Sequence, residues 1–272
     1  MMAQLIKILK MIIWHPSNKG QVLNRILIFL GWQILKRSAR LTVLVTSCGK
    51  RFLAYPDCPV SSMLLYFNVP EYEELSILKS YCQKRKDVFF DIGANIGFYS
   101  IAMEEYFVAV HAFEPNPEAN RRLKENSMLN GLTTKANNLA VSNREGIIHL
   151  CVRGNADPTA HLQDFASEDT ISVPVVSLDK YIQKNQVKEK IVVKIDVEGE
   201  ELRVLEGSVE SLRRKQFSIM QFESLTQEHF ASIIKFVKLL PYGVYATNNN
   251  KLVPIDRRKE GVNNYYLLPL ED

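Results

Sequence analysis

The chain has 272 residues, of which 46% are hydrophobic and 24% are charged. These proportions are typical of a globular protein and exclude a wholly disordered or collagen-like chain, and the length predicts one large domain or one domain with an added segment. None of the four cysteines forms a C-x-x-C pair. This argues against a zinc ribbon or a dithiol redox site and favours a reducing compartment, so we expect a cytoplasmic protein.

Positive charge is concentrated near the N-terminus. Residues 1–51 contain nine lysines and arginines and no acid, because the first acidic residue is Asp57. The rest of the chain contains the other 25 basic residues and all 30 acidic ones, so its net charge is −5. A basic, apolar arm therefore precedes a mildly acidic body.

Residues 1–40 are predicted to form a basic helical extension. Its apolar stretches, 5–14 and 26–35, are separated by a His15-Pro16 break, and neither has the roughly 20 apolar residues that a membrane-spanning helix needs. We expect these helices to cap the domain or to contribute to a homodimer. Two alternatives are peripheral contact with the anionic inner surface of a membrane and binding of an anionic substrate.

Residues 41–86 are predicted to form a β-containing segment, β-rich over 41–67, ahead of the main domain at 87–272. In the main domain strands and helices alternate, which predicts parallel strands with right-handed crossovers. We therefore expect an α/β fold with a doubly wound, seven-stranded, mostly parallel, Rossmann-like sheet. The predicted strands of this domain are 88–92, 107–113, 134–141, 146–152, 171–176, 191–195, 217–222, 244–247 and 265–268, and its predicted helices are 98–106, 117–129, 177–184, 200–213 and 226–240.

Four acids follow or end predicted strands: Asp91, Glu114, Asp196 and Glu223. Ligands of doubly wound sheets bind at the carboxyl ends of the strands. An acid at such a place is partly desolvated and needs a cationic or hydroxyl partner. The four acids together therefore predict a polar ligand at this edge of the sheet.

The turn after the first of these strands reads Asp-Ile-Gly-Ala-Asn-Ile-Gly over residues 91–97. Asn95 and Phe98 depart from the G-x-G-x-x-G dinucleotide pattern, and Asp91 would repel a pyrophosphate, so a ligand with a cationic centre is favoured. Glu114 follows Asp91 by 23 residues, the spacing at which an acid holds a ribose diol. An adenosine with a cationic tail satisfies both acids, and S-adenosylmethionine is such a molecule.

Three motifs resemble the FkbM family of S-adenosylmethionine-dependent methyltransferases. They are the turn at 91–97, His-Ala-Phe-Glu-Pro-Asn-Pro at 111–117, and Lys-Ile-Asp-Val-Glu-Gly-Glu-Glu at 194–201. The resemblance covers about residues 66–223, and the third motif is its most diagnostic part. It implies a class I methyltransferase fold at 87–272 and O-methylation of sugars, polyketides or other secondary metabolites.

The resemblance also implies which residues bind S-adenosylmethionine. The amino-acid tail is expected at the first turn, the ribose at the end of the second strand, and the adenine beside it and at the third strand. In that order the residues are Asp91, Gly93, Asn95 and Gly97, then Glu114, then Pro115, Asn116, Asn138 and Ala140.

Methyl transfer to a hydroxyl requires an aligned acceptor and removal of its proton. The acids that follow the fourth strand are dense, and if the chain stays extended there, Asp196, Glu198 and Glu200 share one face. Asp196, Glu198 or Glu223 is expected to act as general base, or Asp196 and Glu198 hold a divalent cation such as Mg²⁺. Glu200 and Glu201 could instead be first-turn helix acids. The polar loop 153–169, with His161, is a candidate lid over the acceptor.

The hypothesis favoured by the sequence is O-methylation of a hydroxyl on a sugar, glycan or glycolipid. The alternatives are an NAD-binding oxidoreductase and a catalytically inactive methyltransferase fold that serves as a binding module. The acidic body argues against a nucleic-acid partner. The fourth strand is followed by Asp-Val-Glu-Gly rather than by the Asn/Asp-Pro-Pro-Tyr/Phe of amino-methyltransferases, which favours an oxygen acceptor.

Overall fold

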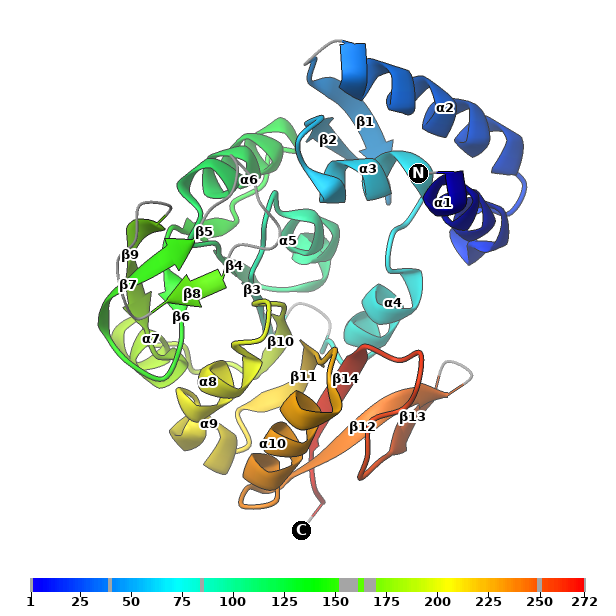
Figure 1. The fold of residues 1–272 in the computed structure, drawn as a ribbon. Coiled ribbons are helices and arrows are strands. Elements are labelled where there is room, and N and C mark those ends of the chain that lie inside the picture. The colour runs from blue at the N-terminus through cyan, green and yellow to red at the C-terminus, as the bar shows by residue number, and fades with distance from the viewer. Residues whose placement is uncertain are drawn as a thin grey trace.

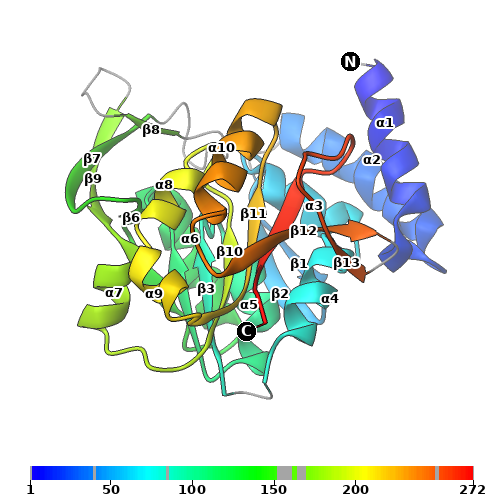
Figure 2. The same ribbon diagram turned by 90° about the horizontal axis from the view of Figure 1, so that it is seen from below.

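The structure, a computed structural model, describes residues 2–38, 41–83, 86–151, 161–163, 170–248 and 251–271. In these ranges the chain folds around a central sheet of eight strands that has helices on both faces, with a four-stranded sheet beside it (Figure 1). The two long N-terminal helices lie together at one end of the molecule (Figure 2).

The strands of the central sheet are β3 (Val88–Ile92), β4 (Ala109–Phe113), β5 (Lys135–Asn137), β10 (Ile191–Ile195), β11 (Phe217–Glu223), β12 (Tyr242–Asn248), β13 (Lys251–Pro254) and β14 (Asn264–Pro269). Their order is β13-β12-β14-β11-β10-β3-β4-β5. The five strands from β11 to β5 are parallel, and β14 is antiparallel to both β11 and β12. The predicted doubly wound, mostly parallel sheet is confirmed, and a hairpin of β12 with β13 adds an eighth strand at its edge.

Neighbouring residues of each central strand point to opposite faces of the sheet and enter different cores. Phe89 packs with α4 and α5, whereas Phe90 packs with α7, α8, α9 and α10. Val192 and Val193 of β10 divide in the same way. These helices, with α6 and the short η2, are α4 (Tyr72–Ser80), α5 (Phe98–Met103), η2 (Glu104–Tyr106), α6 (Pro117–Leu129), α7 (Leu178–Lys184), α8 (Glu201–Glu206), α9 (Val209–Arg213) and α10 (Gln227–Val237).

The predicted helix over 200–213 is two helices, α8 and α9, that break at Gly207 and Ser208. At the break the backbone packs directly on a loop, because a Cβ on Gly207 would lie 2.1 Å from the carbonyl oxygen of Ser142. The sequence pattern suggests one helix because the apolar residues keep the helical period across the break, although the helix itself stops there.

A second sheet, in the order β6-β9-β7-β8, lies beside the carboxyl end of the central one. Its strands are β6 (Ala140–Val141), β7 (Gly146–Cys151), β8 (His161–Gln163) and β9 (Thr170–Val176). The predicted strands over 146–152 and 171–176 are β7 and β9, which pair in antiparallel orientation. The expected single strand over 134–141 is wrong, because β5 and β6 belong to different sheets. The proposed lid over 153–169 lies outside the described residues except for the backbone of 161–163.

The N-terminal segment consists of α1 (Met2–Trp14), η1 (Pro16–Asn18), α2 (Val22–Ser38), β1 (Val43–Ser47), β2 (Lys50–Ala54) and α3 (Pro59–Tyr66). Both predicted helices of the arm are confirmed, but residues 59–66 are helical rather than β-structured. The segment shares one continuous core with α4, α5 and the central sheet. Among the described residues, no helix is long and apolar enough to cross a membrane.

Candidate active site

A cavity lies at the carboxyl ends of β3, β4 and β10, between the central sheet, the second sheet and α3. It encloses about 960 Å³ of space, part of it open to solvent. Seven of the twelve predicted site residues line it: Gly93, Asn95, Glu114, Pro115, Ala140, Asp196 and Glu198. The other five predicted site residues, Asp91, Gly97, Asn116, Asn138 and Glu223, lie around this cavity without lining it.

The turn after β3 contacts the ends of β4 and β10 at the bottom of the cavity. The amides of Gly93 and Ala94 both donate to the carbonyl oxygen of Phe113, at 2.9 and 3.0 Å. Gly93 has a φ of +79°, and a Cβ there would lie 1.8 Å from the backbone oxygen of Asp196. Only glycine fits this position, so the turn packs directly against the end of β10.

Glu114 lies just after β4 with its carboxylate fixed by the two neighbouring loops. Its Oε2 accepts the amide of Asn95 at 2.8 Å, and its Oε1 accepts the amide of Asn116 at 2.9 Å. Burial raises the pKa of Glu114 to about 7. Each carboxylate oxygen keeps acceptor capacity for a further hydroxyl donor, as a ribose diol requires.

Asn116 and Asn138 support the loop that carries Glu114. Asn116 caps α6, and its Oδ1 accepts the amide of Glu118 at 3.0 Å. The Nδ2 of Asn138 donates to the carbonyl oxygens of Glu114 and Pro115 at 2.9 and 2.8 Å. Both asparagines therefore shape the cavity wall without reaching its surface.

Asp91 and Gly97 lie behind the turn and determine how α5 begins. Asp91 is fully buried, and its Oδ2 accepts both the amide and the hydroxyl of Ser100, at 2.9 and 2.7 Å. Burial raises the pKa of Asp91, and the positive charge of Lys194 opposes this increase. Gly97 has a φ of +89° and packs on Leu123 of α6. Asp91 and Gly97 therefore fix the turn to α5 and α6 on the side away from the cavity.

Lys194 of β10 also lines the cavity. Its Nζ donates to Oδ2 of Asp196 at 3.0 Å and lies 5.0 Å from the centre of the Tyr99 ring. Lys194 is 6% exposed, and the nearby carboxylates of Asp196, Asp91 and Glu71 raise its pKa. The positive charge of the buried Lys194 thus lies near three acids, which come from β3, the start of α4 and the end of β10.

Glu71, Tyr99 and Val60 line the cavity but carry no motif that the sequence analysis could use. Glu71 caps α4 with a φ of +47°, and its carboxylate accepts a hydrogen bond from the hydroxyl of Tyr99. Burial raises the pKa of Glu71. The one local signal is a glutamate directly after Pro70 at a helix start, which is too common to identify a site.

The acids after β10 do not lie along an extended chain as expected. Glu198 and Gly199 have φ values of +51° and +98°, so the chain turns there, and Glu198 is exposed at the cavity rim. Glu201 begins α8 as a first-turn acid, and its Oε1 accepts the amides of Val197 and Gly199 at 3.1 and 3.3 Å. Because of this turn, the alternation that would place Asp196, Glu198 and Glu200 on one face of an extended strand does not apply.

Glu223 ends β11 near this turn and is half-buried. Burial, followed by the charges of Asp196 and Glu198, raises its pKa to about 7. Within the described ranges, no three His, Cys, Asp or Glu side chains converge in a way that could hold a metal ion. One oxygen of Asp196, which the sequence analysis pairs with Glu198 as a possible Mg²⁺ site, accepts a hydrogen bond from Lys194.

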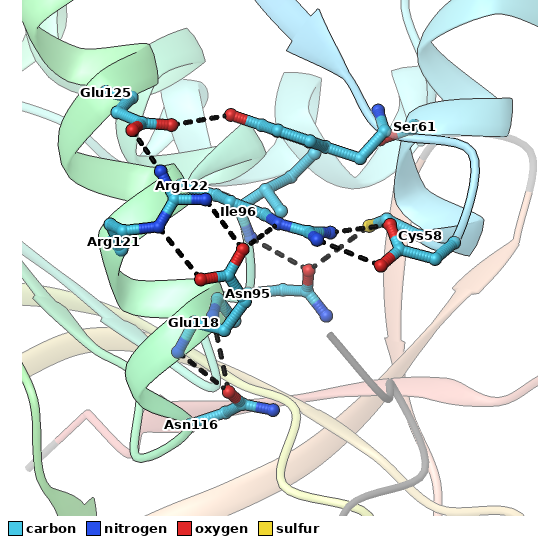
Figure 3. Close-up of polar contacts among 12 residues, drawn as sticks. Cys58, Ser61, Asn95, Ile96, Asn116, Glu118, Arg121, Arg122 and Glu125 are labelled. Atoms are coloured by element: carbon cyan, nitrogen blue, oxygen red, sulfur yellow. Dashed lines mark hydrogen bonds and ion pairs between the residues drawn. The ribbon is translucent and has the colours of Figure 1, made fainter. Parts of the chain in front are cut away.

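A cluster of charged side chains joins the segment before α3 to α6, beside the turn after β3 (Figure 3). The guanidinium of Arg122 on α6 contacts Asp57 through two hydrogen bonds of 2.8 and 2.9 Å, donates to Glu118 at 2.9 Å, and lies 4.2 Å from the centre of the Tyr55 ring. Next to it the thiol of Cys58 donates to Oδ1 of Asn95 at 3.6 Å. The N-terminal segment is thereby attached to the wall of the cavity.

The chain is similar to known methyltransferases. The sequence model described as "Methyltransferase FkbM domain" matches residues 91–243. The chain is 32% identical over 138 residues to the hexuronic acid methyltransferase AglP of Haloferax volcanii, covering 51% of this chain and 56% of that protein. It is 29% identical over 153 residues to the 31-O-demethyl-FK506 methyltransferase FkbM of Streptomyces tacrolimicus, covering 44% of this chain and 59% of that protein.

Among solved structures, a tRNA (uracil-54, C5)-methyltransferase of Pyrococcus abyssi in complex with S-adenosyl-L-homocysteine is similar with a TM-score of 0.47 at 14% identity, covering 83% of this chain and 43% of that one.

The matches to the two curated relatives, AglP and FkbM, span less than two thirds of each relative. The family match, in contrast, includes the turn after β3, Glu114 and the acids after β10, and covers more than half of this chain. This chain belongs to the FkbM methyltransferase domain family.

Proposed function

We propose that this protein transfers the methyl group of S-adenosylmethionine to a hydroxyl of a sugar, glycan or glycolipid in the cytoplasm. One observation carries the proposal: the glycine turn after β3, Glu114 after β4 and Asp196 after β10 meet at a single cavity. The reducing compartment is supported by the four cysteines, which are all unpaired.

The residues of the cavity fit the proposed cofactor. The turn residues Gly93, Ala94 and Asn95 line the cavity where the amino-acid tail would lie, and Glu114 has the acceptor capacity for the two ribose hydroxyls. Pro115 and Ala140, with Leu139, provide an apolar wall for the adenine. Bound there, the cofactor supplies an activated methyl group on a sulfonium.

The acceptor hydroxyl must lose a proton as its oxygen is methylated. Asp196 lies at the end of β10, and its side chain is 42% exposed. Lys194 holds one of its carboxylate oxygens, so we assign the other to the acceptor proton. Glu223 and Glu198 lie next to Asp196 and are the second candidates for this role.

Cofactor binding tests the first half of the proposal. We expect calorimetry to show binding of S-adenosylmethionine and S-adenosylhomocysteine but not of NAD. Glu114→Gln keeps the side-chain volume but loses the carboxylate, and a hydrogen bond to a charged group contributes about 1.5–3 kcal/mol, so we expect affinity to fall roughly 10- to 100-fold. The exposed Glu260 provides the control variant Glu260→Gln, which should bind as wild type does.

The affinity for S-adenosylmethionine is also expected to depend on pH. The ribose hydroxyls need an ionised acceptor, and the pKa of Glu114 is about 7, so below this pH binding must first remove a proton. Affinity should weaken roughly tenfold between about pH 8 and about pH 6. Calorimetry of Glu114→Gln, which has no such proton, should give a flatter profile. An equally steep profile in that variant would mean that another group, or the ligand itself, causes the dependence.

An acceptor screen tests the second half. The relative AglP is named for hexuronic acid methylation, so oligosaccharides that contain hexuronic acid come first, with neutral oligosaccharides beside them. We expect transfer of labelled methyl to a sugar hydroxyl. If the protein binds the cofactor but methylates no carbohydrate, the sugar acceptor is wrong. Failure of the folded protein to bind either adenosyl ligand would contradict the methyltransferase activity itself.

A further inference from the structure

Helix α2 has two apolar faces, of which the fold covers only one. Phe29 and Trp32 are each 2% exposed and belong to the core. On another face, four large side chains at spacings of four, three and four residues remain in solvent. They are Leu23, Leu27, Leu30 and Ile34, with exposed fractions of 72%, 59%, 49% and 67%.

Helix α1 lies beside α2 (Figures 1 and 2) and also exposes apolar side chains. Ile6, Ile13 and Trp14 are 49%, 44% and 81% exposed, and Lys7 and Lys10 are exposed on the same helix. Lysine stems and tryptophan rings bury their apolar parts while their polar ends remain at water, which suits the boundary between lipid and water.

The charged side chains of α1 and α2 themselves are all positive. Lys19 and Arg37 are exposed on the same segment as the two lysines of α1, and no acid precedes Asp57. The rest of the chain has a net charge of −5, so residues 1–51 and the remaining residues carry net charges of opposite sign. A second copy of this chain would bring two positive arms together, whereas an anionic lipid surface complements the charge.

The two helices are fixed to the domain rather than loosely tethered. The Nδ2 of Asn18, which is fully buried, donates to the carbonyl oxygens of Ile12 and Tyr66 at 3.0 and 2.9 Å. The buried Arg25 donates to the carbonyl oxygen of Leu65 at 3.0 Å. Both contacts lead to α3, whose Val60 lines the active-site cavity. A surface bound by α1 and α2 would therefore hold the cavity in a constant orientation.

We propose that the exposed faces of α1 and α2 dock the protein on an anionic lipid bilayer, as a peripheral contact in the plane of the interface. The apolar side chains would enter the acyl boundary while the lysines and Arg37 contact lipid headgroups. This inference concerns where the enzyme works and does not depend on its cofactor or acceptor.

Co-sedimentation of the full chain with vesicles tests the proposal. We expect binding to vesicles of phosphatidylcholine with phosphatidylglycerol, weaker binding in high salt, and little binding to phosphatidylcholine alone. The double variant Leu27→Glu/Leu30→Glu should reduce binding at least tenfold, because it puts two acids into the proposed contact. The matched control is Leu239→Glu, at a leucine that is 80% exposed outside the N-terminal segment and should leave binding unchanged.

Two further measurements keep the test specific. Thermal unfolding of the double variant should match wild type, since both leucines are exposed. Sedimentation velocity without lipid should show a monomer. The proposal is overturned if wild type does not bind anionic vesicles, if the double variant binds as well as wild type, or if the double variant dissociates a wild-type dimer, which would assign the face to a second copy.

Discussion

Gly93→Ala is expected to destabilise the protein by more than about 4 kcal/mol, and to leave little folded enzyme. The added Cβ would lie 1.8 Å from the backbone oxygen of Asp196 and 2.8 Å from its carbonyl carbon, and the contacting atoms are backbone, not the end of a flexible side chain. The turn and the end of β10 must separate to admit it. Urea unfolding monitored by circular dichroism measures the free-energy difference.

Gly49→Ala is the matched control for this effect. Gly49 has a similar φ of +75°, but a Cβ there would meet no atom within 4 Å. It therefore reports the left-handed backbone cost alone, which is about 1–2 kcal/mol. Equal losses in the two variants would show that the close approach of the turn to β10 contributes nothing.

Asp196→Asn is expected to lower kcat by roughly 100- to 10,000-fold, the usual contribution of a general base. The amide oxygen of asparagine can still accept the hydrogen bond from Lys194, so the fold and the affinity for S-adenosylmethionine should stay close to wild type. Transfer of labelled methyl to the acceptor identified by the screen gives kcat, and calorimetry gives the cofactor affinity.

Glu223→Gln and Glu260→Gln accompany this experiment. Glu223 lies near Asp196 but outside the cavity lining, so its variant should lose much less activity than Asp196→Asn. A full rate in Asp196→Asn together with a large loss in Glu223→Gln would reassign the base to Glu223. Loss of cofactor affinity in Asp196→Asn would instead give Asp196 a binding role.

The central sheet was predictable because four of its parallel strands, β3, β4, β10 and β11, are short and mainly apolar runs with their own boundary signals, whereas β5 is a polar strand of three residues. The runs at 88–92 and 191–195 are buried throughout, and the acids that the sequence places at strand ends do lie at one edge of the sheet. Two errors arose where local pattern and fold diverge. Residues 134–141 read as one strand but change sheets after Asn137, and the chain after Asp196 turns through two left-handed residues.

The cavity was only partly predictable for a similar reason. Gly93 and Glu114 belong to motifs whose chemistry is local, so their spacing suffices to place them. Glu71 and Tyr99 meet only because α4 packs against α5, and nothing in the sequence near either residue signals the other. The pairing of Lys194 with Asp196 could be suspected from their two-residue separation, but the burial that makes Lys194 a shared partner of three acids depends on the packing around it.

Short motifs and local periodicity identified the family, most of the elements in their order, and the acids at the ends of strands. Which residues close the cavity, and which apolar face of α2 is covered, depends on how distant segments pack together. Phe29 and Leu30 are neighbours of the same character in the sequence, yet one is buried and the other exposed. Apolar periodicity indicates which surfaces of a helix are stabilised by burial, but the packing of distant segments determines which of these surfaces is buried.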